Sequence, residues 1–392
     1  MCVRLKERNF PNMINIPRLP LVCHFLIDYR VGGPHKYVEV CAEYMAEEYE
    51  SLVFTCGKSK IESVALFNLR RISRYLYPFE VALNTIYIVF LGCYYKRVGR
   101  TVIFNIHGVH NIAPVLAACI LRVSSVLLIH ESMRELRILA KVALFFLRIN
   151  SGIVISVSNN GLNMFGVKDG VVVDSPVDVG YWKEKADIRM SNLEVGRLKE
   201  VKKKLLFVGN LNPIKGLGSL LDGLADLKRP VTLNIIGASM GSHSSYYDEL
   251  QEKTRIALAK NENLEINYLG WQQTGTIRDY LREADLLVMP SVSEGCPIAL
   301  IEALATGCIP FVTDVGDVAE ILSNVLPEAI CSGFDSNSLH VGIEHLLNKI
   351  DKLSQEEVSL LRKQLIEVAE QRFDVSIVAS KIMNLYKVVE NR

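Results

Sequence analysis

Two carboxylates eight residues apart stand at the junction of an expected strand and an expected helix. Glu294 follows the apolar run Leu286–Met289, which has the length of a strand, and Glu302 lies beyond Pro297. Because Pro suits the first turn of a helix, the pattern puts Glu294 in the preceding loop and Glu302 in the second helical turn. Carboxylates in these places can accept hydrogen bonds from sugar hydroxyls.

The start of the same helix is expected to bind an anion. The backbone N–H groups of Gly295, Cys296 and Ile298 would point out of the helix N-terminus, where phosphate groups bind well. Gly307, followed by Pro310, suits the end of the helix. A phosphate-binding helix start flanked by two carboxylates fits a sugar that is attached to a diphosphate.

A lysine in a glycine-containing loop could supply the matching positive charge. Lys215 lies six residues after Gly209 and next to Gly216, in the segment 207–216. Gly216 would let the backbone approach closely, and Lys215 would place its charge on the leaving diphosphate. Alone, such a lysine is more often a solvated loop residue; the two downstream carboxylates favour the functional interpretation.

Strands that alternate with helices are expected to position these side chains. The first unit is an apolar run at 21–27, a loop containing Gly32 and Gly33, and a helical pattern at 35–48. Further strands are expected at 52–55, 101–106, 126–129, 152–157 and 171–173, and then, after a charged segment, at 205–208, 232–236, 265–269, 286–289 and 309–313. This alternation predicts parallel sheets, and 392 residues suffice for two domains.

Taken together, these segments resemble the family 4 glycosyltransferases, which carry a Glu-x7-Glu signature, retain the anomeric configuration and have the GT-B fold. The resemblance includes the segments 207–216, 268–270 and 313–320. It is close over 205–322 and loose in the N-terminal half. It implies an α/β protein whose two Rossmann-like βαβ domains face each other across a cleft.

The same resemblance suggests how the chain is divided. Residues 1–20 would be a tail, 21–182 an acceptor-side N-terminal domain, 183–204 a charged linker and 205–372 the nucleotide-sugar-binding domain. Residues 373–392 would form a final helix that crosses back to the N-terminal domain.

The resemblance also assigns roles to residues. Lys215, Glu294 and His130 would be catalytic, with Glu294 on a hydroxyl of the donor sugar and Glu302 on the ribose. His130 ends an expected strand, and His107, at the end of the preceding strand, is the competing candidate. The implied donor-binding residues are Gly32, Gly33, Gly209, Asn210, Lys215, Gly216, Glu294, Gly295, Cys296, Pro297, Ile298 and Glu302.

One residue departs from the family pattern. The family usually carries Arg after the first Gly of the diphosphate loop, whereas this chain has Asn210, which brings no charge. Either another Arg substitutes, or the enzyme is slower or uses its donor differently. The sequence has no Asp-x-Asp motif and no cluster at metal-ligand spacing. We therefore expect no metal and no other cofactor, and a UDP-sugar as donor, with a GDP-sugar as the alternative.

Composition adds limits on the compartment and the partners. The chain is 49% hydrophobic and 22% charged, which is typical of a globular protein, and its nine Cys include no Cys-x-x-Cys pair, which indicates a reducing compartment. Residues 1–180 carry 20 Lys and Arg against 14 Asp and Glu, a charge of +6, and the remainder carries 24 against 29, or −5. This asymmetry is either ordinary scatter or a cationic domain that meets an anionic membrane.

The longest apolar run, 81–95, leaves two interpretations open. It is too short to span a bilayer, so it is either a buried helix or a face that dips into the lipid headgroups. No signal peptide is visible. We expect a cytoplasmic protein, with a peripheral position at the inner face of the cell membrane as a variant of that location.

The sequence therefore predicts a retaining, metal-independent glycosyltransferase. It would move a sugar from a nucleotide diphosphate sugar to a glycan or lipid-linked acceptor in cell-surface polysaccharide synthesis of the lipopolysaccharide type, with no nucleic acid as partner. Two alternatives keep the fold: a nucleotide-sugar 2-epimerase, and a non-catalytic nucleotide-binding homologue, which Asn210 favours.

Overall fold

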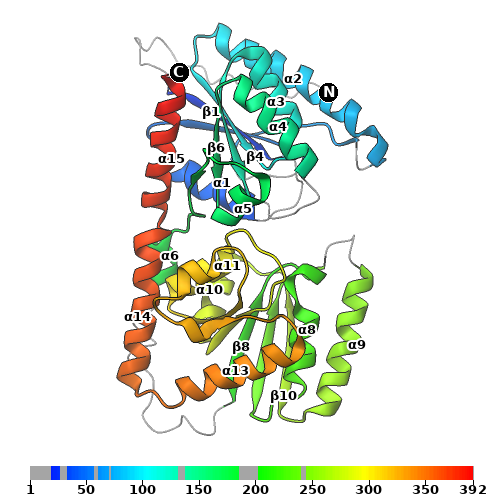
Figure 1. The fold of residues 1–392 in the computed structure, drawn as a ribbon, viewed down its shortest axis with the longest axis vertical. Coiled ribbons are helices and arrows are strands. Elements are labelled where there is room, and N and C mark those ends of the chain that lie inside the picture. The colour runs from blue at the N-terminus through cyan, green and yellow to red at the C-terminus, as the bar shows by residue number, and fades with distance from the viewer. Residues whose placement is uncertain are drawn as a thin grey trace.

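The computed structural model describes residues 19–26, 33–56, 61–69, 72–130, 137–184, 202–239 and 244–391. Within these residues, strands and helices alternate and build two parallel sheets, one above the other in Figure 1. The prediction of two Rossmann-like α/β domains is thus confirmed. The first eighteen residues of the predicted tail, and Gly32, lie outside the described part.

The first sheet has the strand order β3-β2-β1-β4-β5-β6-β7. Its strands are β1 (Leu21–Leu26), β2 (Glu50–Thr55), β3 (Ser63–Ala65), β4 (Val102–His107), β5 (Ser124–Ile129), β6 (Ile153–Ser156) and β7 (Val171–Val172). Every residue of β1 and β4 is buried, as expected for parallel strands that helices cover on both faces. The chain order reverses between β1 and β4, which opens a ligand position at the carboxyl edge of the sheet.

Two groups of helices cover this sheet, one on each face. The first group is α1 (Gly33–Tyr44) and α15 (Val375–Glu390). On the other face lie α2 (Tyr77–Arg97), α3 (Ile112–Leu121), α4 (Arg137–Ile149) and α5 (Asn159–Phe165), with η2 (Arg74–Leu76) before α2. Figure 1 shows α2, α3 and α4 side by side on the side of the upper domain away from α15.

The second sheet has the strand order β10-β9-β8-β11-β12-β13 and reverses between β8 and β11. Its strands are β8 (Lys203–Val208), β9 (Val231–Ile236), β10 (Leu264–Gly270), β11 (Leu286–Met289), β12 (Ile309–Thr313) and β13 (Ile330–Cys331). Its helices are η4 (Pro213–Lys215), α8 (Leu217–Leu224), α9 (Ser244–Lys260), α10 (Thr274–Glu283), α11 (Ile298–Thr306), α12 (Val318–Leu322), η6 (Pro327–Ala329), α13 (Ser336–Ile350) and α14 (Gln355–Arg372).

The chain enters the second domain before residue 183, where the linker was expected to begin. Val177, Val179 and Trp182, in and just before α6 (Val179–Lys183), are buried in the core of the second domain. Most of the expected linker, residues 185–201, lies outside the described residues. The domain crossover therefore precedes α6.

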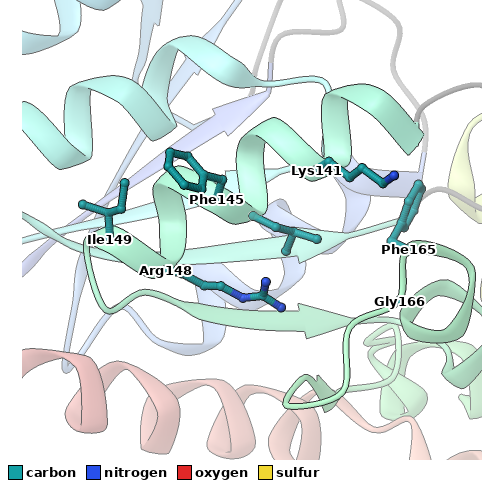
Figure 2. A pocket seen from close by; sticks show the side chains of 7 residues that line it. Lys141, Phe145, Arg148, Ile149, Phe165 and Gly166 are labelled. Carbon is teal, nitrogen blue, oxygen red and sulfur yellow. The ribbon is translucent and has the colours of Figure 1, made fainter.

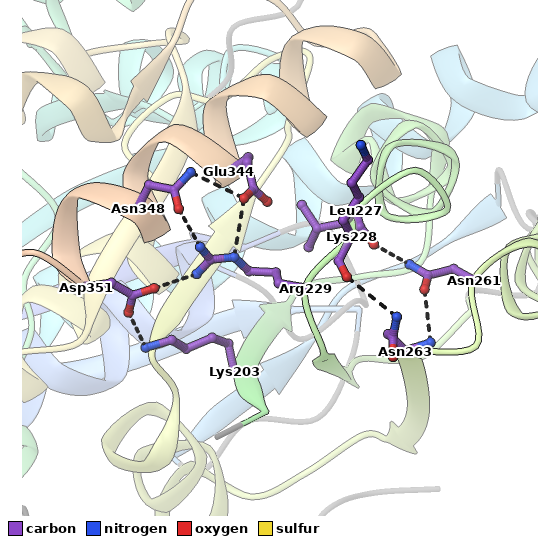
Figure 3. A network of polar contacts seen from close by, with 9 residues as sticks. All are labelled: Lys203, Leu227, Lys228, Arg229, Asn261, Asn263, Glu344, Asn348 and Asp351. Atoms are coloured by element: carbon purple, nitrogen blue, oxygen red, sulfur yellow. Dashed lines mark hydrogen bonds and ion pairs between the residues drawn. The ribbon is translucent and has the colours of Figure 1, made fainter. Parts of the chain in front are cut away.

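The start of β8 also differs from the expected boundary at 205, and charged side chains explain why. Asp351, which follows α13, accepts from Lys203 Nζ at 2.6 Å and from Arg229 at 2.8 Å. Arg229 also donates to Asn348 at 2.6 Å (Figure 3). Lys203, which looks like part of a linker in the sequence, thus begins the strand, because Asp351 at the end of α13 neutralises it.

The last two helices connect the domains. In Figure 1, α14 runs along the lower domain and α15 along the upper one. The amide of Asn105 in β4 donates to the hydroxyl of Tyr386 in α15 at 2.6 Å, and the Ser124 hydroxyl donates to the carbonyl of Val389 at 2.7 Å. The final helix is thereby attached to the domain in which the chain begins.

Candidate functional site

Lys215 and Glu294 meet where β8 and β11 end. The ammonium of Lys215 donates to Oε1 of Glu294 at 2.6 Å, and the hydroxyl of Ser291 donates to the same oxygen at 2.7 Å. The side chain of Lys215 is 27% exposed and that of Glu294 is 11% exposed. The structure therefore brings together the predicted cation and the first predicted carboxylate, with the lysine still open to solvent.

Gly216 allows the two loops of this pair to lie against each other. Its φ of 68° is in the left-handed region, and a Cβ at this position would overlap the carbonyl oxygen of Pro290. One residue before Lys215, the carbonyl of Ile214 accepts from the amide of Val292 at 2.8 Å. Close backbone packing thus sets the distance between Lys215 and Glu294.

The second carboxylate meets a lysine from the other domain. Glu302, in the second turn of α11, is 4% exposed, and its Oε1 accepts from Lys36 Nζ at 2.7 Å. Lys36 lies in the first turn of α1, and sequence reasoning missed it, because a charged residue on a helix carries no signal of a distant partner. Burial raises the pKa of Glu302 more than Lys36 lowers it.

As pH rises, the free energy of unfolding of the Glu302→Gln variant should therefore increase relative to that of the wild type. A carboxyl whose pKa is raised by folding contributes stability below its unfolded pKa of about 4.3 and loses it as pH rises through the folded value. Glutamine has no such loss. Urea unfolding of both proteins from pH 4 to pH 8 measures the difference in unfolding free energy, and a difference that does not change with pH would contradict the burial argument.

The control for this experiment is Glu328→Gln, whose trend should have the opposite sign. A hydrogen bond from Lys349 is the main cause that lowers the pKa of Glu328. A carboxyl whose pKa is lowered by folding contributes stability above its unfolded pKa. The decrease in unfolding free energy caused by Glu328→Gln should therefore grow as pH rises.

Two histidines stand at the carboxyl ends of β4 and β5. Nδ1 of His107 and Nε2 of His130 are 2.9 Å apart, and the ring of Tyr37 packs edge-on against His130 at 5.3 Å. Burial, followed by the nearby His130, His24 and His35, lowers the pKa of His107 well below its usual value. The structure thus separates the two candidates: His107 is a buried, neutral partner, and His130 lies nearer the second domain.

The starts of α1 and α11 face each other across the domain interface. A Cβ on Gly33 would lie 3.5 Å from Cδ1 of Ile298, and a Cβ on Gly295 would lie 2.8 Å from the carbonyl oxygen of His130. Because the first amides of a helix have no acceptor within the helix, both helix starts direct N–H groups to this interface. Gly33, Gly295, Ile298 and His130 are therefore neighbours, as a shared site requires.

The other predicted residues lie close by, with some differences. A Cβ on Gly209 would lie 3.7 Å from Cδ of Lys215. The carbonyl of Asn210 accepts a hydrogen bond from the backbone N–H of Asn212. Pro297 is the N-cap of α11 and not part of its first turn. Cys296 packs against the cores of both domains, and burial raises its pKa to about 11, so its side chain joins the domains and its backbone remains for a ligand.

The segment 313–320, which is part of the resemblance to the family, also contacts the first domain. Asp317 accepts from the amide of Asn159 at 3.1 Å, and Glu320 pairs with Arg372 at 2.9 Å. Arg372 pairs in turn with Asp174 at 2.8 Å. These acidic residues therefore hold α5, α12 and α14 together beside the site.

The chain is similar to known glycosyltransferases. Residues 190–372 match the model of the family described as "Glycosyl transferases group 1". An uncharacterized glycosyltransferase of Methanocaldococcus jannaschii is 24% identical over 207 residues, which are 53% of this chain and 49% of that protein. The putative teichuronic acid biosynthesis glycosyltransferase TuaC of Bacillus subtilis is 31% identical over 116 residues, 30% of this chain and 26% of that protein. The chain thus spans about half or less of the length of these curated relatives.

The whole chain is similar to solved structures. The Anabaena protein HepE, solved in complex with UDP and glucose, superimposes with a TM-score of 0.73 at 16% identity over 93% of this chain and 99% of that protein. Since the identity is low, this likeness concerns the fold. Residues 190–372 are therefore similar to the glycosyl transferases group 1 family, and they lie within a two-domain fold of the GT-B type.

Proposed function

We propose that this chain is a retaining glycosyltransferase of the family 4 type. It would transfer a sugar from a nucleoside diphosphate sugar to a glycan or lipid-linked acceptor. The observation that carries the proposal is the position of the Lys215 ammonium, 2.6 Å from Glu294, which lies in the loop before α11. A cation, a carboxylate and a helix N-terminus at one place suit a diphosphate that is linked to a sugar.

In the proposed reaction, the donor diphosphate lies between the start of α11 and Lys215. As the bond between the anomeric carbon and the diphosphate oxygen breaks, the ammonium and the backbone amides stabilise the negative charge on the leaving group. The acceptor oxygen bonds to the anomeric carbon on the same face, and its proton leaves with the nucleoside diphosphate. Glu294 accepts a hydrogen bond from a sugar hydroxyl, and Glu302 accepts one from the ribose.

Two further residues complete the proposed site. His130 would contact the donor sugar near the reacting carbon, held in place by the hydrogen bond with His107. The family's usual Arg in the diphosphate loop is replaced by Asn210 in this chain. Lys36, from the first domain, would supply a second positive charge in its place. Closure of the two domains on the donor would then bring the acceptor to the anomeric carbon and exclude water.

The proposed substrates follow the relatives. One curated relative is named for teichuronic acid biosynthesis, and HepE was solved with UDP and glucose. We therefore propose cell-surface polysaccharide synthesis at the cytoplasmic face of the membrane, of the lipopolysaccharide type or a related one. UDP-sugars are the first donors to try and GDP-sugars the second.

The test has two steps. Nucleoside diphosphates are screened for a rise in Tm, since a ligand at 100 times its Kd stabilises the native state by about 2.7 kcal/mol. The matching sugar nucleotides are then incubated with glycan and lipid-linked acceptors, and NMR identifies the anomer formed. An inverted product would overturn the retaining mechanism. Conversion of the donor without acceptor would indicate the 2-epimerase, and binding without turnover the non-catalytic homologue.

Transfer should persist when divalent metals are removed. If Lys215 and the start of α11 stabilise the leaving diphosphate, the rate in excess EDTA should stay within about twofold of the rate with Mg²⁺, since no charge-stabilising group is lost. Nucleoside diphosphate release, measured with and without EDTA, checks this. A loss of about 100-fold on chelation, reversed by added Mg²⁺, would move the stabilising role from Lys215 to a metal.

A further inference from the structure

Helix α2 buries polar side chains together with Ile88 and leaves several large apolar side chains exposed. Its buried residues include Glu80, Asn84 and Thr85. Its exposed large apolar side chains are Phe79, Leu83, Ile86, Phe90 and Tyr94. A helix that faces water shows the reverse pattern, and so the interpretation of the run 81–95 as a buried helix is wrong. This outward face is suited to an environment other than water.

Hydrogen bonds fix this orientation of α2. The side-chain amide of Asn84 accepts from the backbone N–H of Phe67 at 2.9 Å and donates to its carbonyl at 3.0 Å. The hydroxyl of Thr85 donates to the carbonyl of Ala113 in α3 at 3.4 Å. Rotation of the helix would break these bonds, so the outward position of the apolar residues is a specified part of the fold.

Neighbouring helices extend the apolar surface. The exposed residues Ile138, Val142, Phe145 and Ile149 recur every three or four positions along α4, and therefore lie on one side of that helix. Ile120 at the end of α3 is also exposed. Figure 1 shows the three helices side by side. We call the following set the apolar face: Phe79, Leu83, Ile86, Phe90, Tyr94, Ile120, Ile138, Val142, Phe145 and Ile149.

The exposed charged side chains that the structure describes on α2, α3 and α4 have one sign. In the residues of α2, α3 and α4, Glu80 is the single acidic residue, and it is buried. The exposed charged residues of these helices and of the α3 C-cap are Lys96, Arg97, Arg122, Arg137, Lys141 and Arg148. Apolar area with positive charge and without exposed carboxylates matches a surface whose outer groups are anionic and whose interior is apolar.

A pocket at the edge of the apolar face combines both features. It has a volume of about 700 Å³ and lies between α4 and the end of α5, where Phe145, Ile149 and Phe165 line it together with Lys141 and Arg148. Figure 2 shows Lys141 directed toward Phe165, and Arg148 projecting from the same helix two turns later. Within the part of the chain that the structure describes, neither cation has an ion-pair partner. Such a pocket can take a phosphate headgroup with part of its apolar chain.

We propose that the apolar face docks onto the surface of an anionic lipid bilayer. Ile86 and Phe90 enter the boundary between headgroups and acyl chains, and Lys141 and Arg148 bind lipid phosphates. The single sign of the charges favours a bilayer over a protein partner, whose surface would ordinarily offer both signs. Among the described residues, no helix has the length and apolar composition needed to cross a membrane, which agrees with docking on one leaflet. The inference does not depend on the proposed transfer reaction.

The experiment measures binding to vesicles by co-sedimentation. The full chain is mixed with vesicles of phosphatidylcholine alone, or with 30% phosphatidylglycerol, in 0.1 M NaCl. We expect the protein to sediment with the anionic vesicles, and the bound fraction to fall in 0.5 M NaCl, since salt screens the contribution of the cations. An absence of binding to the anionic vesicles would overturn the proposal.

Two variants and one control locate the surface. Ile86→Glu/Phe90→Glu changes side chains that are 67% and 70% exposed and should weaken binding by about 100-fold or more, because two inserted side chains are lost. Lys141→Gln/Arg148→Gln should weaken binding to the anionic vesicles by about 30-fold, at about 5-fold for each charge. The control Val341→Glu/Leu360→Glu alters side chains that are 56% and 57% exposed on α13 and α14, and should bind like the wild type.

Two outcomes with these variants would contradict bilayer docking. An equal loss in the control would show a general effect of added negative charge. A wild-type oligomer that Ile86→Glu/Phe90→Glu converts to a monomer, seen by light scattering, would show that a second copy covers the apolar face. Unchanged Tm values verify that each variant is folded.

Discussion

Lys215→Ala should lower kcat for transfer by about 100- to 1000-fold, the loss typical when one charge-stabilising donor is removed. Lys215 is the cation that touches Glu294 at the proposed diphosphate position, and Asn210 in the same loop offers no charge to replace it. The Kd for the nucleoside diphosphate should also rise, because the ammonium contacts the bound product. The measurement is steady-state release of nucleoside diphosphate, with the Kd taken from titration calorimetry.

The matched control is Lys253→Ala. Lys253 pairs with Asp222 at 2.6 Å and is 28% exposed, against 2.6 Å and 27% for Lys215, but it lies on α9. Both variants lose an equivalent ion pair, so a general effect of that loss would appear in both. If Lys215→Ala is as active as Lys253→Ala, Lys215 has no role in the proposed mechanism. That result would leave the proposed docking to a lipid bilayer untouched.

Gly216→Ala should lower the free energy of unfolding by about 2 to 5 kcal/mol. Left-handed backbone costs an L-residue about 1 to 2 kcal/mol, and overpacking typically adds about 1 to 3 kcal/mol. At Gly216, φ is 68° and the new Cβ would overlap the carbonyl oxygen of Pro290, which belongs to the backbone and cannot rotate away. Urea unfolding at 25 °C measures the change. Transfer should fall as well, since the loop that holds Lys215 must move.

Gly270→Ala separates the two causes. Gly270 has a φ of 67° and lies in the same domain, but a Cβ there would meet nothing within 4 Å. The unfolding free energy of this variant should therefore fall only by the cost of left-handed backbone, about 1 to 2 kcal/mol. If Gly216→Ala and Gly270→Ala are equally destabilised, close packing of the two loops does not constrain position 216.

The parts of the site that could be read from the sequence lie within short segments. Gly209, Lys215 and Gly216 belong to one loop, and Glu294 and Glu302 belong to one loop and its helix. Their relative positions depend on local strand, turn and helix geometry, which residue types and spacing indicate. The sequence could not show whether His107 or His130 is enclosed, because both stand at the ends of buried strands and enclosure depends on packing.

The sequence could not predict contacts between segments that are far apart in the chain. Lys36 and Glu302 are separated by 266 positions, and their pairing depends on how the two domains are placed. The orientation of α2 was also undetermined, because its apolar residues occur all round the helix and no periodic stripe marks an inner side. Hydrogen bonds from Asn84 to the backbone of Phe67 and from Thr85 to the carbonyl of Ala113 in α3 decided which side faces out.

The amino-acid sequence by itself determined the two α/β domains and the proposed diphosphate loop with its lysine and carboxylates. Hydrophobic runs, glycines and helix starts act over a few residues, so they can be recognised without a structure. The tertiary structure decided which lysine pairs with Glu302, which histidine is buried, and which side of α2 meets the surroundings. These features arise from packing between distant segments, where burial and satisfied hydrogen bonds select one arrangement among several that local sequence allows.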